Sequence, residues 1–95
     1  GENYLRASGL AYTIVRPGGL LNEPGGKGEI VLEQGDKPVG GRGLFIPRED
    51  VATLCVEALE HPEAKFRTFE VHRVDGPPVS DWKARFAALK PDPRP

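Results

Sequence analysis

The apolar run over residues 10–15 limits the possible folds of this chain more than any other feature. It reads Leu-Ala-Tyr-Thr-Ile-Val, which is rich in β-branched and aromatic side chains and carries no charge. Such a run is typical of a strand buried on both faces of a parallel sheet. Residues 2–8 have helix-compatible composition and end at Gly9, a residue type that closes helices in the left-handed conformation. No capping residue precedes them, so we expect the last two turns of a longer helix to lead into this strand.

A second helix is predicted over residues 48–60. It follows Pro47, and its apolar residues recur at helical spacing to form one stripe. The stripe consists of Val51, Leu54, Cys55, Ala58 and Leu59. Glu49 and Asp50 fall in the first turn, where carboxylates favour the positive end of the helix dipole.

A strand and a last helix follow. Residues 66–74 alternate without a clean apolar face, which fits a strand near a sheet edge. Strand, crossover helix and strand make a βαβ unit, whose strands pair parallel. Ser80 or Asp81 is placed to cap the last helix, and residues 90–95 form a frayed tail. The apolar stripe of the last helix is formed by Trp82, Phe86 and Leu89.

Between the first strand and the long helix lies a segment rich in glycine and proline. Residues 17–28 are predicted to be a loop, because Gly and Pro in this density disfavour a helix or a central strand. Residues 29–33 and 43–46 are predicted to be short strands of a hairpin turning at Gly35-Asp36. The fold class is thus α/β, with a βαβ unit, a small β hairpin and a terminal helix.

Composition narrows the class further. Ninety-five residues make one small domain, expected over residues 1–90 with a flexible tail over 91–95. A net charge of -1 argues against nucleic acid as a partner. The apolar runs are too short to cross a membrane, so we expect a cytoplasmic, soluble chain. Cys55 is the only cysteine, and its place in the apolar stripe predicts an inert, buried thiol.

Motifs that would carry catalysis fail on inspection. A phosphate-binding loop ending at Gly26-Lys27 lacks its first glycine, where Leu21 stands, and has Gly28 in place of Ser or Thr. Tyr4 and Tyr12 are not followed by a lysine four residues later, the pair with which short-chain dehydrogenases move a proton. His72, on the last strand, is expected to be solvated, and His61 to complement the dipole at the end of the helix. The sequence therefore names no catalytic residue and no metal site.

The carboxyl end of the first strand is where ligand binding is structurally plausible. In open parallel sheets, ligands lie beyond the carboxyl ends of the strands. Here that end opens into Arg16, Pro17, Gly18, Gly19 and Leu20. One interpretation is that the glycines leave amides free to approach a ligand closely. The other is a loop that only turns the chain, with Arg16 reaching out to solvent.

Three segments together resemble a known family. They are residues 1–20, with Arg16-Pro17-Gly18-Gly19 near the end, residues 46–52 (Ile-Pro-Arg-Glu-Asp-Val-Ala) and Thr68-Phe69-Glu70. In this combination the chain resembles the C-terminal part of atypical short-chain dehydrogenases, the NAD(P)-binding, NmrA-like or sugar-epimerase-like proteins.

The resemblance implies the C-terminal portion of a Rossmann-type, doubly wound parallel sheet. Residues 10–16 would be its sixth strand, 48–60 the next crossover helix and 67–73 the seventh strand, at the edge. It implies that the segment from Arg16 to Leu20 lies against the nicotinamide end of NAD or NADP. Gly1 would then lie inside a helix of a longer parent protein. The first βα turn, which holds most of a dinucleotide, is missing, so this chain alone should bind NAD(P) very weakly or not at all.

Three functional hypotheses follow. The first is a piece of an NAD(P)-dependent oxidoreductase or epimerase-like protein, inactive by itself. The second is part of a non-catalytic NAD(P)-binding sensor or regulator, since the chain lacks the catalytic tyrosine pair. The third is an independent interaction module. An unpaired strand edge recruits other chains, so we also expect a homo-oligomer formed through the exposed edge of the first strand.

Overall fold

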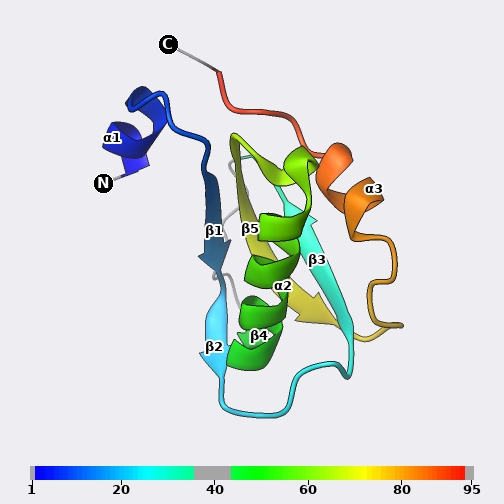
Figure 1. Cartoon of the computed structure of the whole chain (residues 1–95). Coiled ribbons are helices and arrows are strands. Elements are labelled where there is room, and N and C mark those ends of the chain that lie inside the picture. Colours follow the sequence, from blue (N-terminus) through cyan, green and yellow to red (C-terminus); the bar gives the residue numbers. More distant parts are fainter. Residues whose placement is uncertain (1, 36–43, 94–95) are drawn as a thin grey trace.

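The computed structural model describes residues 2–35 and 44–93, and it is a mixed α/β chain (Figure 1). The predicted turn residue Asp36 and the predicted strand start at Gly43 lie outside the described residues. The elements are α1 (Glu2–Ala7), β1 (Thr13–Pro17), β2 (Gly19–Leu21), β3 (Glu29–Glu33), β4 (Phe45–Pro47), α2 (Arg48–Glu60), the 3-10 helix η1 (Pro62–Ala64), β5 (Arg67–Val74) and α3 (Trp82–Ala87).

The predicted βαβ unit is confirmed. β1 and β5 pair parallel, from Thr13 opposite Arg67 to Pro17 opposite Val71, and α2 lies between them in the chain. β5 is nevertheless the central strand of the three-stranded sheet β1-β5-β3, so its predicted edge position is wrong. β3 pairs antiparallel along its other side and supplies the hydrogen-bonding partner that the sequence pattern does not reveal.

The predicted hairpin of residues 29–33 with 43–46 is also wrong. β3 pairs with β5, whereas β4 pairs parallel with β2, a short strand inside the segment that was expected to be only loop. The glycines allow β2 and β4 to approach each other. A Cβ added to Gly18 would lie 2.5 Å from the Leu44 carbonyl oxygen, and one added to Gly19 would overlap the Phe45 ring. Side-chain-free backbone therefore permits this pairing.

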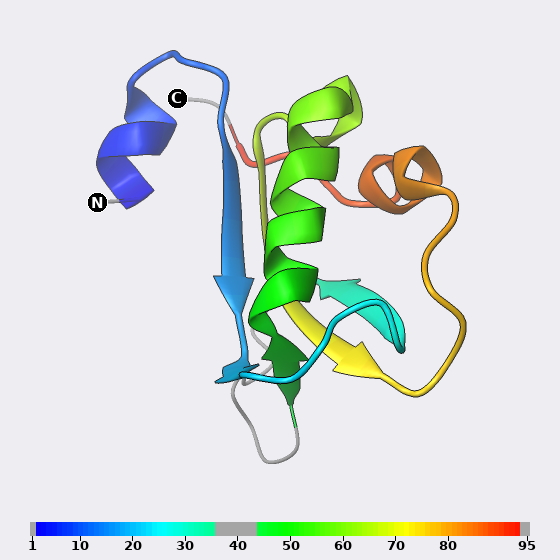
Figure 2. The ribbon, with the colours of Figure 1, turned by 60° about the horizontal axis from the view of Figure 1, so that its bottom comes forward.

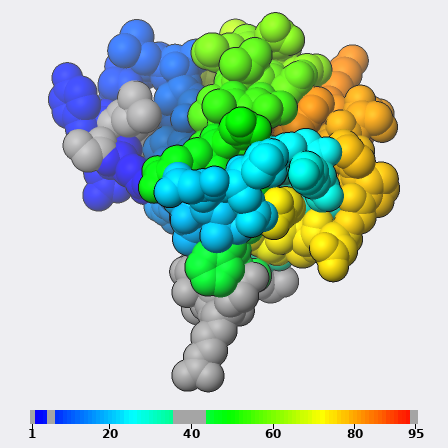
Figure 3. Space-filling model, turned by 90° about the horizontal axis from the view of Figure 1, so that it is seen from below, coloured from blue at the N-terminus to red at the C-terminus, as the bar shows by residue number. Residues whose placement is uncertain are grey.

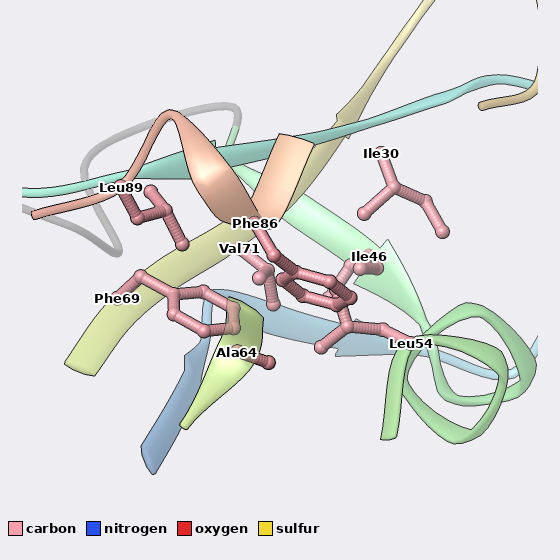
Figure 4. Packing of buried hydrophobic residues seen from close by; sticks show 8 residues of the cluster. All are labelled: Ile30, Ile46, Leu54, Ala64, Phe69, Val71, Phe86 and Leu89. Atoms are coloured by element: carbon pink, nitrogen blue, oxygen red, sulfur yellow. The ribbon is translucent and has the colours of Figure 1, made fainter. Parts of the chain in front are cut away.

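The core lies between one face of the sheet and the two helices α2 and α3 (Figure 4). Its centre is Phe86 of α3, whose ring centroid lies 6.2 Å from that of Phe69 on β5 and 5.8 Å from that of Trp82. The fully buried members are Ile46, Leu54, Ala64, Phe69, Val71 and Phe86. The predicted cap is present too, because Asp81 accepts a hydrogen bond from the backbone amide of Ala84.

The side of the molecule around β1 is less buried than predicted. Of the side chains on β1 only Ile14 is buried, because β5 is its one neighbour in the described sheet. Cys55 is exposed, so the prediction of a buried thiol is wrong. Only part of the predicted apolar stripe on α2 is buried. Leu54 is fully buried, whereas Leu59 is 88% exposed.

Part of the segment expected to be a frayed tail is held against the sheet. The Asp92 carboxylate accepts hydrogen bonds from the Tyr12 hydroxyl at 2.9 Å and from the Thr68 hydroxyl at 2.6 Å. The Asp92 amide also donates to the Phe66 carbonyl oxygen at 2.7 Å. Two hydrogen bonds join Gln34 to the backbone of Lys90. These contacts join Asp92 to Tyr12 and to the start of β5, and Lys90 to Gln34, which follows β3.

Candidate functional site

The carboxyl ends of the parallel strands β1 and β5 lie at one end of the molecule. In Figure 1 both arrows point to the lower end, where β2, β4 and the start of α2 also lie, and Figure 3 views this end directly. β2 begins only two residues after the end of β1. The segment from Arg16 to Leu20 therefore stands where α/β sheets place their ligands.

The amides of Gly18 and Gly19 are not free, in contrast to the first interpretation of the sequence. Gly18 donates to the carbonyl oxygen of Val71, and Gly19 to that of Leu44, each at 3.0 Å. Both donors belong to the pairing of this segment with β5 and the start of β4. The glycines thus permit close backbone packing within the protein, and these two amides do not form an anion cradle.

Arg16 is bound by carboxylates on two elements. Its Nε donates to Glu2 of α1 at 3.2 Å, and its Nη1 lies 3.6 Å from Glu70 of β5. The hydrogen bond to Glu2 is the main reason that the pKa of Arg16 is raised above its ordinary value. Its side chain is 44% exposed, yet it ties α1 to the sheet. With two anionic partners it is poorly suited to holding a diphosphate.

The start of α2 holds the loop that follows β2. Glu49 accepts a hydrogen bond from the Gly25 amide at 2.7 Å, and Asp50 accepts one from the Gly26 amide at 2.8 Å. Arg48 donates to the side chain of Asn22 at 2.9 Å. We call residues 48–50 the clamp. The sequence interpretation missed it. The one available signal was the pair Gly25-Gly26, whose backbone amides need acceptors when they are not in a helix or a strand. Because the loop crosses the start of α2, this helix end is covered by the protein itself (Figure 2).

Neither histidine is placed to act at this end of the sheet. His72 is buried, and His61 lies at the opposite end of α2. His72 is 5% exposed, so its predicted solvated position is wrong; its Nε2 lies 3.8 Å from a carboxylate oxygen of Glu33. Side chains alternate along a strand, so His72 and Glu70 face away from the core that Phe69 and Val71 join. His61 follows the end of α2 and its Nδ1 lies 2.7 Å from the Glu57 carbonyl oxygen.

An open, mainly apolar groove of about 390 Å³ lies between β1 and α2. Thr13 and Val15 line it from the strand, and Cys55, Ala58 and Leu59 from the helix. Of these helix residues, Ala58 also packs against the core, whereas Cys55 and Leu59 are exposed. The groove is distinct from the clamp, which lies at the first turn of α2.

The chemistry of the strand end fits one part of a dinucleotide better than another. Among the described residues from Arg16 to Leu21, the single cation is paired with two carboxylates, and the Gly18 and Gly19 amides are hydrogen-bonded within the protein. Pro17 is exposed and Leu20 is 42% exposed. A partly apolar surface whose one cation is already paired suits a flat ring better than a diphosphate, which needs cations or free amides.

The helices that the structure describes include none with the length and apolar character needed to span a bilayer.

The parallel strands joined by α2 have the arrangement of part of a Rossmann-like sheet. A family model described as NAD(P)H-binding matches residues 1–62, and the chain belongs to this family. The resemblance inferred from the sequence is thereby confirmed.

Three relatives illustrate the family. The chain is 40% identical over 91 residues to sanguinarine reductase of Eschscholzia californica. The matched region covers 93% of this chain and 33% of that protein. An uncharacterised chloroplastic protein of Arabidopsis thaliana is also 40% identical over 91 residues, or 93% of this chain and 28% of the relative. An uncharacterised sugar epimerase of Bacillus subtilis is 40% identical over 80 residues, or 80% of this chain and 33% of the relative. The chain thus spans about a third or less of each of these relatives.

Proposed function

We propose that this chain is the C-terminal part of an NAD(P)-dependent oxidoreductase or epimerase-like protein, and that it supplies the nicotinamide-side and substrate-side surface. The observation that carries the proposal is the continuation of β1 into β2 at the carboxyl end of a parallel sheet. Membership of an NAD(P)H-binding family supports it, as does a relative named as a reductase.

In this proposal the residues from Arg16 to Leu20 line the nicotinamide end of the cofactor. A bound NAD(P) supplies the hydride donor or acceptor. Arg16 holds the end of β1 through Glu2 and Glu70, Gly18 and Gly19 fix the course of the backbone, and Pro17 and Leu20 present apolar surface that excludes water. The residues that would hold the adenosine and diphosphate belong to the first βα turn of such folds.

A non-catalytic sensor or regulator of the same family is the second candidate. The observation that favours it is that neither tyrosine is followed by a lysine at the fourth position. Tyr12, moreover, donates its hydroxyl hydrogen to Asp92 at the end of the sheet opposite to the clamp. We further propose a cytoplasmic location, although the name of the Arabidopsis relative places that protein in the chloroplast.

Self-association of residues 1–95 is a separate proposal. In the described sheet, β1 pairs only with β5, which leaves its outer edge available to another strand. Leu59 and Cys55 beside it are exposed and line the apolar groove. Light scattering across a concentration series should show dimers or larger species, and a stable monomer at every concentration would contradict this.

Titration of NADPH, followed by its fluorescence, tests the main proposal. The protein expressed from its whole gene should bind NADPH or NADH saturably, whereas residues 1–95 alone should bind very weakly or not at all. Saturable micromolar binding by residues 1–95 would overturn the assignment of this chain to the nicotinamide side alone. Absence of binding by the whole protein would overturn the proposed function itself.

A further inference from the structure

The carboxylates at the start of α2 do not cap the helix to which they belong. The N-cap residue is Pro47, whose side chain makes no capping hydrogen bond. Glu49 and Asp50 instead accept the amides of Gly25 and Gly26, in the loop that follows β2. The two carboxylates therefore hold another segment in place, in addition to their favourable position at the helix dipole.

Asp50 holds the loop at a cost in folding stability. It is 3% exposed, and among the described residues its Oδ2 is buried without a hydrogen-bond partner. A buried carboxylate with one unpartnered oxygen destabilises the folded state. Gly25 also packs closely against this carboxylate, because a Cβ added to it would lie 2.6 Å from Asp50 Oδ1. Such local conflicts with stability are found most often at functional sites.

The clamp sets the position of β2. Leu21 ends β2, and the first residue held by the clamp, Asn22, follows it directly. On its other side β2 pairs with β4, and β4 ends at Pro47, the residue before the clamp. β4 and the start of α2 are thus continuous in the chain (Figure 2). β4 pairs with β2, and the clamp binds the residues just after β2.

We propose that Arg48, Glu49 and Asp50 are positioning residues for the cofactor, acting through β2 and the Gly18-Gly19-Leu20 backbone. This inference rests on the proposed function, because β2 lies beside the segment assigned there to the nicotinamide ring. Loss of the clamp lets β2 move away from the sheet end. The affinity for the nicotinamide half then falls, while the affinity for the adenosine half, held elsewhere in the protein, stays the same.

The test compares two ligands on the protein expressed from its whole gene. The first is NADPH or NADH, whichever the wild type binds, and the second is the matching ADP-ribose, which lacks nicotinamide. Asp50→Leu removes the acceptor for Gly26 at similar volume, whereas Asp50→Asn keeps an acceptor oxygen there. Glu49→Ala removes the acceptor for Gly25 from an exposed position. Glu60→Leu, at the exposed far end of α2, is the matched control for loss of a carboxylate.

We expect Asp50→Leu to raise the Kd of the full dinucleotide about tenfold, since small displacements of positioning groups carry effects of this order. The Kd of ADP-ribose should stay within about twofold of wild type, as should every value for Asp50→Asn and Glu60→Leu. If Asp50→Leu does not fold, Glu49→Ala carries the test, with a smaller loss confined to the full dinucleotide.

Two outcomes overturn the inference alone: equal loss for both ligands, which means a general structural role, or no loss for either in folded variants. A wild-type protein that binds neither dinucleotide is a different result. It overturns the proposed function, and the inference falls with it.

Discussion

The two sides of α2 show how differently one helix is used. Leu54 is fully buried in the core cluster, which is centred on Phe86. On the other side, Cys55 and Leu59 line an open groove beside β1, and Leu59 is 88% exposed. Both sides carry apolar residues, but among the described residues only Leu54 of these three belongs to the buried core cluster. We therefore expect the core side of α2 to contribute more to stability than the side that lines the groove.

The largest effect should come from the centre of the packed side. Phe86→Ala removes a fully buried ring that touches Phe69 and Trp82 and leaves a cavity. We expect a loss of about 3–5 kcal/mol in the free energy of unfolding, enough to unfold a small domain. Urea unfolding followed by circular dichroism measures it. A loss below about 1 kcal/mol would mean that the core is not centred on this ring.

A matched pair on α2 tests the contrast directly. Leu54→Ala should cost about 2–5 kcal/mol of unfolding free energy, because Leu54 is fully buried. Leu59→Ala, the same change at an 88% exposed position, should stay within about 0.5 kcal/mol. Denaturant melts of both variants give the comparison, at a protein concentration low enough to keep the chain monomeric. Equal losses would show that the groove side is covered in solution.

The cap of α3 gives a smaller effect on the packed side. Asp81→Ala removes the acceptor for the Ala84 amide and should lower the free energy of unfolding by about 1 kcal/mol. Asp81→Asn keeps an acceptor and serves as the control, with little change expected. Thermal melts measure both variants. An equal drop in Tm for Asp81→Ala and Asp81→Asn would contradict the capping role of Asp81.

The smallest effect is expected on the open side, where Arg16 links α1 to the sheet. Arg16→Gln breaks its ion pairs with Glu2 and Glu70, which are partly solvated. We expect a loss of about 1 kcal/mol or less, shrinking further in 1 M salt because exposed ion pairs are screened. Lys83→Gln, at an exposed position of α3, is the control for removing one positive charge. A salt-independent loss would point to packing and not to charge.

Much of the fold could be read from local pattern. The helix over 48–60, the strand ending near residue 74 and a cap at Ser80 or Asp81 follow from periodicity and end signals. The structure has all three, with Asp81 as the cap. These features depend on residues close together in the chain. The parallel pairing of β1 with β5 was also accessible, because a crossover helix favours it.

The errors concern partners that are distant in the sequence. β3 was paired with the wrong strand, His72 was expected in solvent, and Cys55 was expected in the core. In each case the residue type fits two environments, and the neighbour that decides between them comes from another part of the chain. The clamp also depends on residues that are distant in the sequence, because 24 positions separate Gly26 from Asp50.

The sequence by itself determined the α/β class, the order of the main helix and strands, and the family resemblance, since these depend on local periodicity and short motifs. Only the tertiary structure decided that the Gly18 and Gly19 amides are used within the protein, that Arg16 is paired with Glu2 and Glu70, and that Asp50 is buried against the loop after β2. The physical reason is that a hydrogen-bonding group binds whichever partner the folded chain brings within about 3 Å, and sequence spacing does not record that distance.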